Sequence, residues 1–198
     1  MLGDCLGKSV IVVGMRGVGK STVLHKVVEK LDGVKIVNYG DVLLQLVVEN
    51  NYAKNRDEMR MMPNPIQLKV NAETWSKLAQ EKGSFMLDTH AFVEHTGRFI
   101  PGLPIEDVEK LKGLCGLFYL DADNDTIRSR AAKDHTRIRE GQGDVEMNNY
   151  RYASISALSY LSTRLNIPLY IIQNKEGMLD QTVDIFVQHL HDAFGDKK

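Results

Sequence analysis

Residues Gly14-Met15-Arg16-Gly17-Val18-Gly19-Lys20-Ser21-Thr22 decide the fold, because they match the pattern G-x-x-x-x-G-K-[ST] of a phosphate-binding loop. Its glycines allow backbone angles closed to other residues and let the main chain approach oxygen atoms closely. Successive N–H groups then form a nest for an anion, and the following helix adds its positive end. Lys20 supplies a mobile cation for the phosphates, and the Ser21 hydroxyl is a ligand for Mg²⁺.

The sequence on either side of the loop fits this mechanism. The apolar, β-branched run Val10-Ile11-Val12-Val13 precedes the loop and is typical of a buried parallel strand. After the loop, apolar residues recur at helical spacing between Val23 and Leu31. These patterns place the loop between a strand and a helix, which makes a chance match in a glycine-containing turn a poor alternative. Kinases, ATPases, GTPases and transport motors all carry such a loop, so the reaction has to be inferred from other residues.

Length and composition indicate one domain over residues 1–198. The chain is 43% hydrophobic and 26% charged, which is ordinary for a globular protein with one sizeable core. A net charge of −1 argues against a broad basic face for nucleic acid. No apolar run approaches the roughly 20 residues of a membrane span, and residues 1–9 lack the features of a signal peptide. We therefore expect a cytoplasmic protein with no membrane partner, in which Cys5 and Cys115 are reduced structural thiols.

Apolar runs alternate with helical patterns along the chain. This alternation predicts an α/β fold in which a parallel sheet is covered by helices on both faces. We expect strands at 9–13, 34–37, 84–88, 114–120 and 169–173. We expect helices at 21–31, 40–50, 65–80, 105–111, 124–132, 146–165 and 178–193, with irregular segments at 50–65 and 133–145.

Polar residues follow most of these strands, and the carboxyl ends of parallel strands meet in one crevice. Asp88 ends a buried strand beside the phosphate-binding loop, where a carboxylate holds Mg²⁺ directly or through water. The alternative for Asp88 is that it caps the next turn. Thr89 and His90 follow it, and His90 either orients a phosphate or satisfies the turn.

Basic residues outnumber acidic ones between Arg128 and Arg139. Guanidinium groups stabilise a phosphoryl group in transfer, and a basic flap hinged at glycines would exclude water from it. Arg151 begins a helix after this flap and is expected to point toward the same phosphates. Arg128 is expected to be solvated.

Two further segments suggest nucleotide contacts. Arg56 or Arg60 could bind the phosphate of a second substrate, and a surface ion-pair network with Asp57 and Glu58 is the alternative for Arg56. The run Gln173-Asn174-Lys175-Glu176-Gly177 lacks the final aspartate of the guanine-reading N-K-x-D motif. A loop that presents backbone groups to adenine is the more natural interpretation.

In these residues and their order along the chain, the protein resembles archaeal adenylate kinases, a branch of the nucleoside monophosphate kinases. The resemblance runs nearly end to end and depends on the combination of motifs. They are G-x-x-G-V-G-K-S-T at 14–22, V-N-Y-G-D at 37–41, Y-A-K-x-R-D-E-M-R at 52–60, D-T-H at 88–90, P-G-L-P at 101–104, T-R-x-R at 136–139 and I-x-Q-N at 171–174.

The resemblance implies a P-loop NTPase fold, a three-layer α/β/α sandwich with a five-stranded parallel sheet. It implies the reaction ATP + AMP ⇌ 2 ADP with Mg²⁺, an AMP-binding segment at about 38–62, a short lid at about 133–145, and a homotrimer. The implied positions are Lys20, Arg130, Arg137, Arg139 and Arg151 around the phosphates; residues 14–22 and Asn174 on ATP; Asn38, Gly40, Arg60, Thr89 and His90 on AMP; and Ser21 and Asp88 on Mg²⁺.

The chain departs from the family pattern in three places. Ile138 replaces the usual asparagine between the two arginines of T-R-x-R, and the stretch 95–99 lacks a proline that usually follows D-T-H. Leu43-Leu44-Gln45 occupies the place where bacterial and eukaryotic relatives carry an arginine, so Arg60 becomes more important for the AMP phosphate. The alternatives to an adenylate kinase are a kinase for UMP or CMP and a nucleotide-dependent switch or RNA-associated ATPase.

Overall fold

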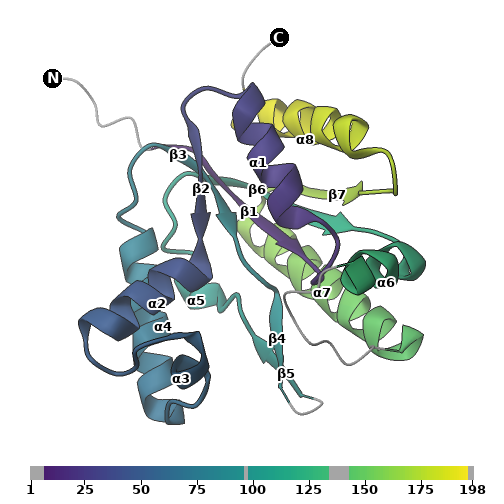
Figure 1. Cartoon of the computed structure of the whole chain (residues 1–198). Coiled ribbons are helices and arrows are strands. Elements are labelled where there is room, and N and C mark those ends of the chain that lie inside the picture. Colours follow the sequence, from purple (N-terminus) through teal and green to yellow (C-terminus); the bar gives the residue numbers. More distant parts are fainter. Residues whose placement is uncertain (1–6, 96–97, 134–142, 196–198) are drawn as a thin grey trace, which may run out of the picture.

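Five strands form one parallel sheet in the order β2-β3-β1-β6-β7 (Figure 1). The structure is a computed structural model and describes residues 7–95, 98–133 and 143–195. The strands are β1 (Ser9–Gly14), β2 (Val34–Asn38), β3 (Ser84–Asp88), β6 (Leu114–Asp121) and β7 (Leu169–Gln173). Since all neighbours run parallel, their carboxyl ends lie at one edge of the sheet, where the polar clusters were predicted to meet.

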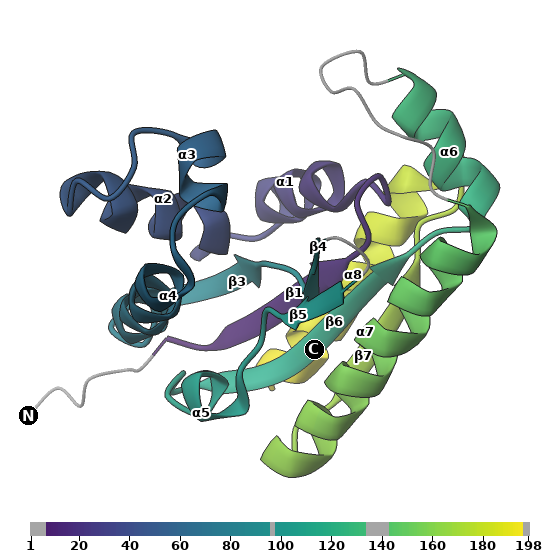
Figure 2. The same cartoon turned by 90° about the horizontal axis from the view of Figure 1, so that it is seen from below.

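Helices cover both faces of the sheet, giving the expected three layers (Figure 2). Helices α1 (Lys20–Lys30) and α8 (Leu179–Phe194) share one apolar core, and α4 (Asn64–Leu78), α5 (Ile105–Val108) and α7 (Asp144–Leu165) share the other. Central strand β1 serves both cores because its side chains alternate: Val10 and Val12 face the first, and Ile11 and Val13 the second. Burying each of these side chains contributes roughly 1.5–3 kcal/mol.

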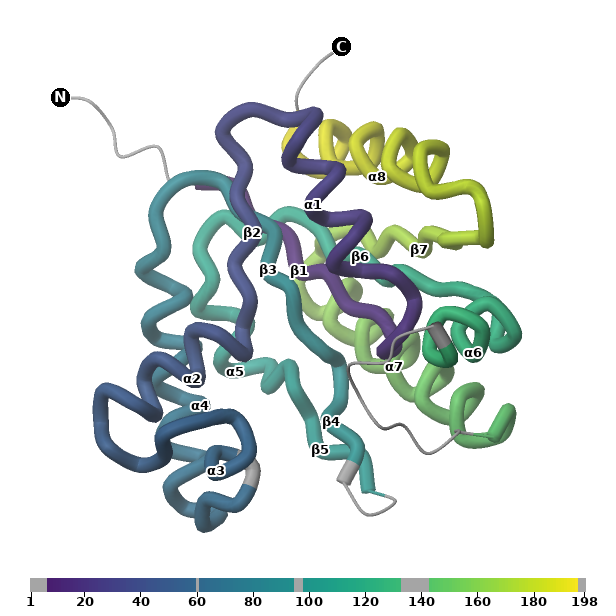
Figure 3. Tube along the Cα trace, in the orientation of Figure 1, coloured from purple at the N-terminus to yellow at the C-terminus, as the bar shows by residue number. Residues whose placement is uncertain are grey.

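Two small units extend from the sheet (Figure 3). Helices α2 (Tyr39–Glu49) and α3 (Arg56–Arg60) pack with the first part of α4 around a separate cluster formed by Val47, Ala53, Met62 and Val70. An antiparallel hairpin joins β4 (Phe92–His95) to β5 (Arg98–Pro101). The remaining helix, α6 (Asn124–Lys133), follows β6 at the functional edge of the sheet.

The predicted strands of the main sheet and the predicted helices are confirmed, with ends that differ by a few residues. Helix α3 and the β4–β5 hairpin were not among the predicted elements. A capping signal marks α3, since Asn55 accepts hydrogen bonds from the N–H groups of Asp57 and Glu58, and Glu58 lies at the position that completes a capping box.

Two other expectations concern the cysteines and the membrane. The Sγ–H of Cys115 donates to the carbonyl of Ser9 over 3.2 Å, and Cys5 lies outside the described residues. None of the helices in the described ranges combines the length and the apolar character that crossing a bilayer requires.

Candidate active site

The phosphate-binding loop links β1 to α1 in the conformation that its glycines predict. Gly17 and Gly19 both have φ of +88°, in the left-handed region. Within the described ranges, no side chain caps the first turn of α1, so the N–H groups at this helix end are open to an anion. Met15 and Val18 are buried, so these two residues offer only backbone groups to a ligand.

Gly19→Ala is expected to weaken nucleotide binding roughly tenfold or more and to destabilise the fold. The added Cβ would lie 2.7 Å from Asn174 Nδ2, and the alanine would have to adopt the left-handed backbone conformation of Gly19. Gly33→Ala is the matched control, since Gly33 has φ of +79° and nothing within 4 Å of an added Cβ. The control should lose about 1 kcal/mol of unfolding free energy and bind ADP as the wild type does. Calorimetric titration with ADP measures the affinity, and urea unfolding measures the free energy of unfolding. Equal ADP affinity in the two variants would contradict the steric argument.

Lys20 and Asp88 form an ion pair at the centre of this edge. Lys20 begins α1 and Asp88 ends β3, and both side chains are about nine-tenths buried, with exposures of 11% and 8%. Burial lowers the pKa of the Lys20 ammonium to about 8. The Asp88 carboxylate is thus the ion-pair partner of the ammonium that we expect to bind phosphates.

A cavity of about 360 Å³ opens on the β2–β3 side of this pair. Oxygen-bearing side chains that suit Mg²⁺ line it, namely Ser21, Asp88 and Asp41, where a hydroxyl and carboxylates are the ligands this ion prefers. These residues fit Mg²⁺, bound directly or through water. Asp41 is an addition to the residues expected from the sequence. The other lining residues are Leu24, His25, Ile36 and Asn38.

A second cavity of about 260 Å³ opens on the other side of β1, between the loop and the end of β7. Arg130 from α6 crosses it, with Nη1 donating to the carbonyl of Val18 over 2.9 Å and Nη2 to that of Asn174 over 3.2 Å. Buried Asn174 donates from Nδ2 to the same Val18 carbonyl over 2.7 Å. The remaining lining residues are Gly19, Thr22, Lys175, Glu176, Gly177 and Leu179.

Thr89 and His90 follow Asp88 directly after the end of β3. Thr89 is buried, and its N–H donates to the carbonyl of Val12 over 3.1 Å. Burial, with smaller effects from the nearby charges of Lys20 and Arg16, lowers the pKa of His90 to about 4. The imidazole is therefore neutral at pH 7 and can offer a hydrogen bond, not a charge, to a phosphate.

The segment at 38–62 contributes α2 and α3. Arg56 forms an ion pair with Asp41 across the first turn of α2. Its Nη1 lies 3.0 Å from where a Cβ on Gly40 would be, so Gly40 allows this approach. Arg60 ends α3, and its side chain is not among the described parts of the structure.

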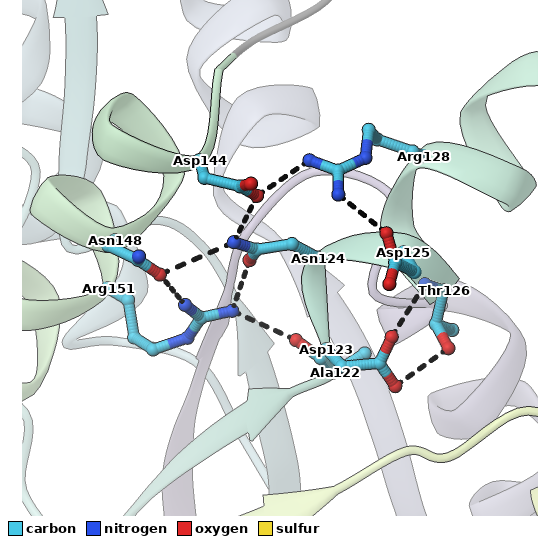
Figure 4. Close-up of polar contacts among 9 residues, drawn as sticks. All are labelled: Ala122, Asp123, Asn124, Asp125, Thr126, Arg128, Asp144, Asn148 and Arg151. Atoms are coloured by element: carbon cyan, nitrogen blue, oxygen red, sulfur yellow. Dashed lines mark hydrogen bonds and ion pairs between the residues drawn. The ribbon is translucent and has the colours of Figure 1, made fainter.

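A network of polar side chains joins the end of β6 to the first turns of α6 and α7 (Figure 4). At its centre is Arg151, whose guanidinium donates to Asp121, Asn124, Asn148 and the carbonyl of Ala122. Its ion pair with Asp121 measures 2.9 Å and is buried, with side-chain exposures of 15% and 7%. The expectation that Arg151 begins its helix is wrong, because α7 begins at Asp144. In this structure its donors are engaged by protein groups.

Arg128 lies at the outer edge of the same network. It forms ion pairs of 2.6 Å with Asp125 and Asp144, and it is exposed as predicted. Arg137 and Arg139, with most of the predicted lid at 133–145, lie outside the described residues.

Comparisons with known proteins agree with this geometry. A family model described as "AAA domain" matches residues 13–147. Adenylate kinase from Methanopyrus kandleri is 31% identical over 193 residues, covering 92% of this chain and 97% of the relative. Adenylate kinase from Sulfurisphaera tokodaii is 34% identical over 175 residues, covering 81% and 90%. Shikimate kinase from Aquifex aeolicus shares the fold, with a TM-score of 0.57 at 12% identity over 96% of this chain and 99% of that one.

Proposed function

Because this chain belongs to the adenylate kinase family, we propose that it catalyses the reversible, Mg²⁺-dependent transfer of a phosphoryl group from ATP to AMP, giving two ADP. The observation that carries this proposal is the pair of cavities on the two sides of β1, both lined by residues of the loop or the first turns of α1. A nucleotide switch needs one such site, whereas a nucleotide kinase needs a donor side and an acceptor side.

The donor nucleotide is proposed to lie along residues 14–22. The open N-terminus of α1 and the backbone N–H groups of the loop bind its phosphates, and Lys20 leaves Asp88 to stabilise the charge on the transferred group. Adenine enters the cavity between Arg130 and the loop at Asn174. A guanidinium stacks well on an aromatic base, which suits Arg130 to this position.

Mg²⁺ is proposed to be held by Ser21 and Asp88, with Asp41 acting directly or through water. When bound, this ion would neutralise charge on the phosphate oxygens. Since Ser21 is in the first turn of α1 and Asp88 contacts Lys20, the protein groups that bind the ion and the phosphates are already adjacent.

The acceptor is proposed to bind on the β2–β3 side. The AMP contacts carried over from the resemblance are Asn38, Gly40, Arg60, Thr89 and His90. The neutral imidazole of His90 is suited to a hydrogen bond with AMP. Transfer in a crevice that excludes water would rely on positioning, since the protein contributes little covalent chemistry.

The lid at about 133–145, with Arg137 and Arg139, is proposed to complete the site around the phosphates together with Arg130 and Arg151. For Arg151, this role requires that its donors exchange protein partners for phosphate oxygens. A cytoplasmic location and a homotrimer are also proposed, and the homotrimer rests on the resemblance alone.

A panel of acceptors tests the proposed reaction. Purified protein is incubated with ATP and Mg²⁺, and with AMP, UMP, CMP or no acceptor, and nucleotides are separated by chromatography. We expect rapid ADP formation with AMP, at a rate well above that with UMP, CMP or water. Preference for UMP or CMP would favour another monophosphate kinase, and hydrolysis that no monophosphate alters would exclude both kinase assignments in favour of a switch or RNA-associated ATPase.

A further inference from the structure

Asn38 forms two hydrogen bonds that join different parts of the site. It ends β2 directly beside Asp88, its partner in the β2–β3 register. Its Nδ2 donates to Asp88 Oδ2 over 2.9 Å, while its Oδ1 accepts from the N–H of Asp41 over 3.2 Å and so caps α2. Only one amide orientation satisfies both partners, because an amide oxygen facing the carboxylate would find no proton to accept.

The hydrogen bond from Asn38 to Asp88 determines which carboxylate oxygen of Asp88 faces Lys20. Rotation of an aspartate carboxylate is otherwise soft, with broad energy wells. Since Oδ2 is held by Asn38, Oδ1 faces the ammonium of Lys20. Asp88 is itself buried, so little water competes for either oxygen.

The bond to Asp41 determines where α2 begins. A side-chain cap on the first turn holds one of the N–H groups that the helix cannot satisfy itself. Helix α2 in turn carries Gly40 and Asp41, with which Arg56 of α3 is in contact. One amide therefore connects the carboxylate beside Lys20 to the segment on the acceptor side.

We propose that Asn38 is a positioning residue for phosphoryl transfer, which orients the Asp88 carboxylate and ties it to the first turn of α2. This inference rests on the proposed function and reassigns Asn38, which the resemblance places among direct AMP contacts. Asn38 then acts on Mg²⁺ and the phosphates through Asp88, and the position of the acceptor segment is coupled to that of the carboxylate.

Two substitutions separate the two bonds. Asn38→Ser keeps a good N-cap but is too short to retain the amide donor to Asp88, whereas Asn38→Ala removes both. Both variants should lower kcat roughly tenfold and raise the Mg²⁺ concentration at half-maximal rate, as loss of a partner of a metal-binding carboxylate does. Only Asn38→Ala should also lower the melting temperature. KM for ATP at saturating Mg²⁺ should change little in either.

A double-mutant cycle with Asp88→Asn tests whether Asn38 acts through Asp88. The effect of Asn38→Ala on kcat should fall from roughly tenfold to less than about twofold when Asp88 is already replaced. The same factor in both backgrounds, or a change confined to KM for AMP, would overturn the proposal in favour of direct contact with AMP.

Calorimetric ADP binding with and without Mg²⁺ provides a readout that needs no turnover. Mg²⁺ should strengthen ADP binding less in Asn38→Ser than in the wild type, and an equal effect in both would refute the positioning role. If the wild type fails to convert AMP, the proposed function is wrong, and this binding comparison still decides whether Asn38 acts through Asp88.

Discussion

Lys20→Met should lower turnover of ATP and AMP roughly 10³-fold and leave the fold in place, because the ammonium lies where it can stabilise a transferred phosphoryl group. Lys20 is held in the first turn of α1, where it forms an ion pair with Asp88. Methionine preserves most of the side chain's volume and removes its charge. A coupled assay of ADP formation measures turnover, and circular dichroism during heating measures the fold.

Lys26→Met is the control for this result. Lys26 lies in the same helix, its side chain is 42% exposed, and its ion pair with Asp180 is long, at 3.8 Å. It should keep wild-type turnover, because solvent screens an exposed pair of this kind. Turnover of Lys20→Met within a few-fold of the control would show that the ammonium does not stabilise the transferred group.

The lowered pKa of Lys20 supplies a second readout at the same residue. Without ligand, the ammonium loses its proton as pH rises through about 8, and bound phosphates favour the charged form. ADP binding above pH 8 should therefore take up protons, and affinity should fall as pH rises further. Lys20→Arg stays charged and should show neither trend. Calorimetry in two buffers with different ionisation heats measures the uptake.

Much of this site could be predicted from sequence because its main features are local. The strand, the loop and the helix from Ser9 to Lys30 depend on residue spacing and on glycine, and the structure confirms all three. The register of parallel strands then brings Asn38 and Asp88 together, since both end adjacent strands. Even α3, which was not among the predicted helices, carries a local signal in the Asn55 cap and in Glu58, the third residue of the helix.

Other features depend on contacts between residues far apart in the chain, for which local spacing holds no signal. Arg151 pairs with Asp121, 30 residues earlier, because α7 packs against the end of β6. The charge of His90 depends on burial and on the approach of Lys20 and Arg16 from another strand-to-helix connection. In both cases the residue type suggested a phosphate contact, and only the fold shows which protein groups surround it.

Arg151→Ala should lower the free energy of unfolding by about 3–5 kcal/mol, because it leaves the buried carboxylate of Asp121 without its ion-pair partner. The variant also loses the donors to Asn124, Asn148 and the carbonyl of Ala122, which connect α6, α7 and β6. Urea unfolding followed by circular dichroism measures the change.

Two comparisons identify the cause of this loss. Arg128→Ala removes an arginine from the same network, but its partners Asp125 and Asp144 are exposed, so stability should change little. Adding Asp121→Asn to Arg151→Ala removes the uncompensated charge and should recover part of the stability, since an unpaired buried carboxylate costs more than a neutral amide. If Arg151→Ala were no worse than Arg128→Ala, the network would not stabilise the fold. If the double variant were as unstable as Arg151→Ala, the loss would come from the missing donors and not from Asp121.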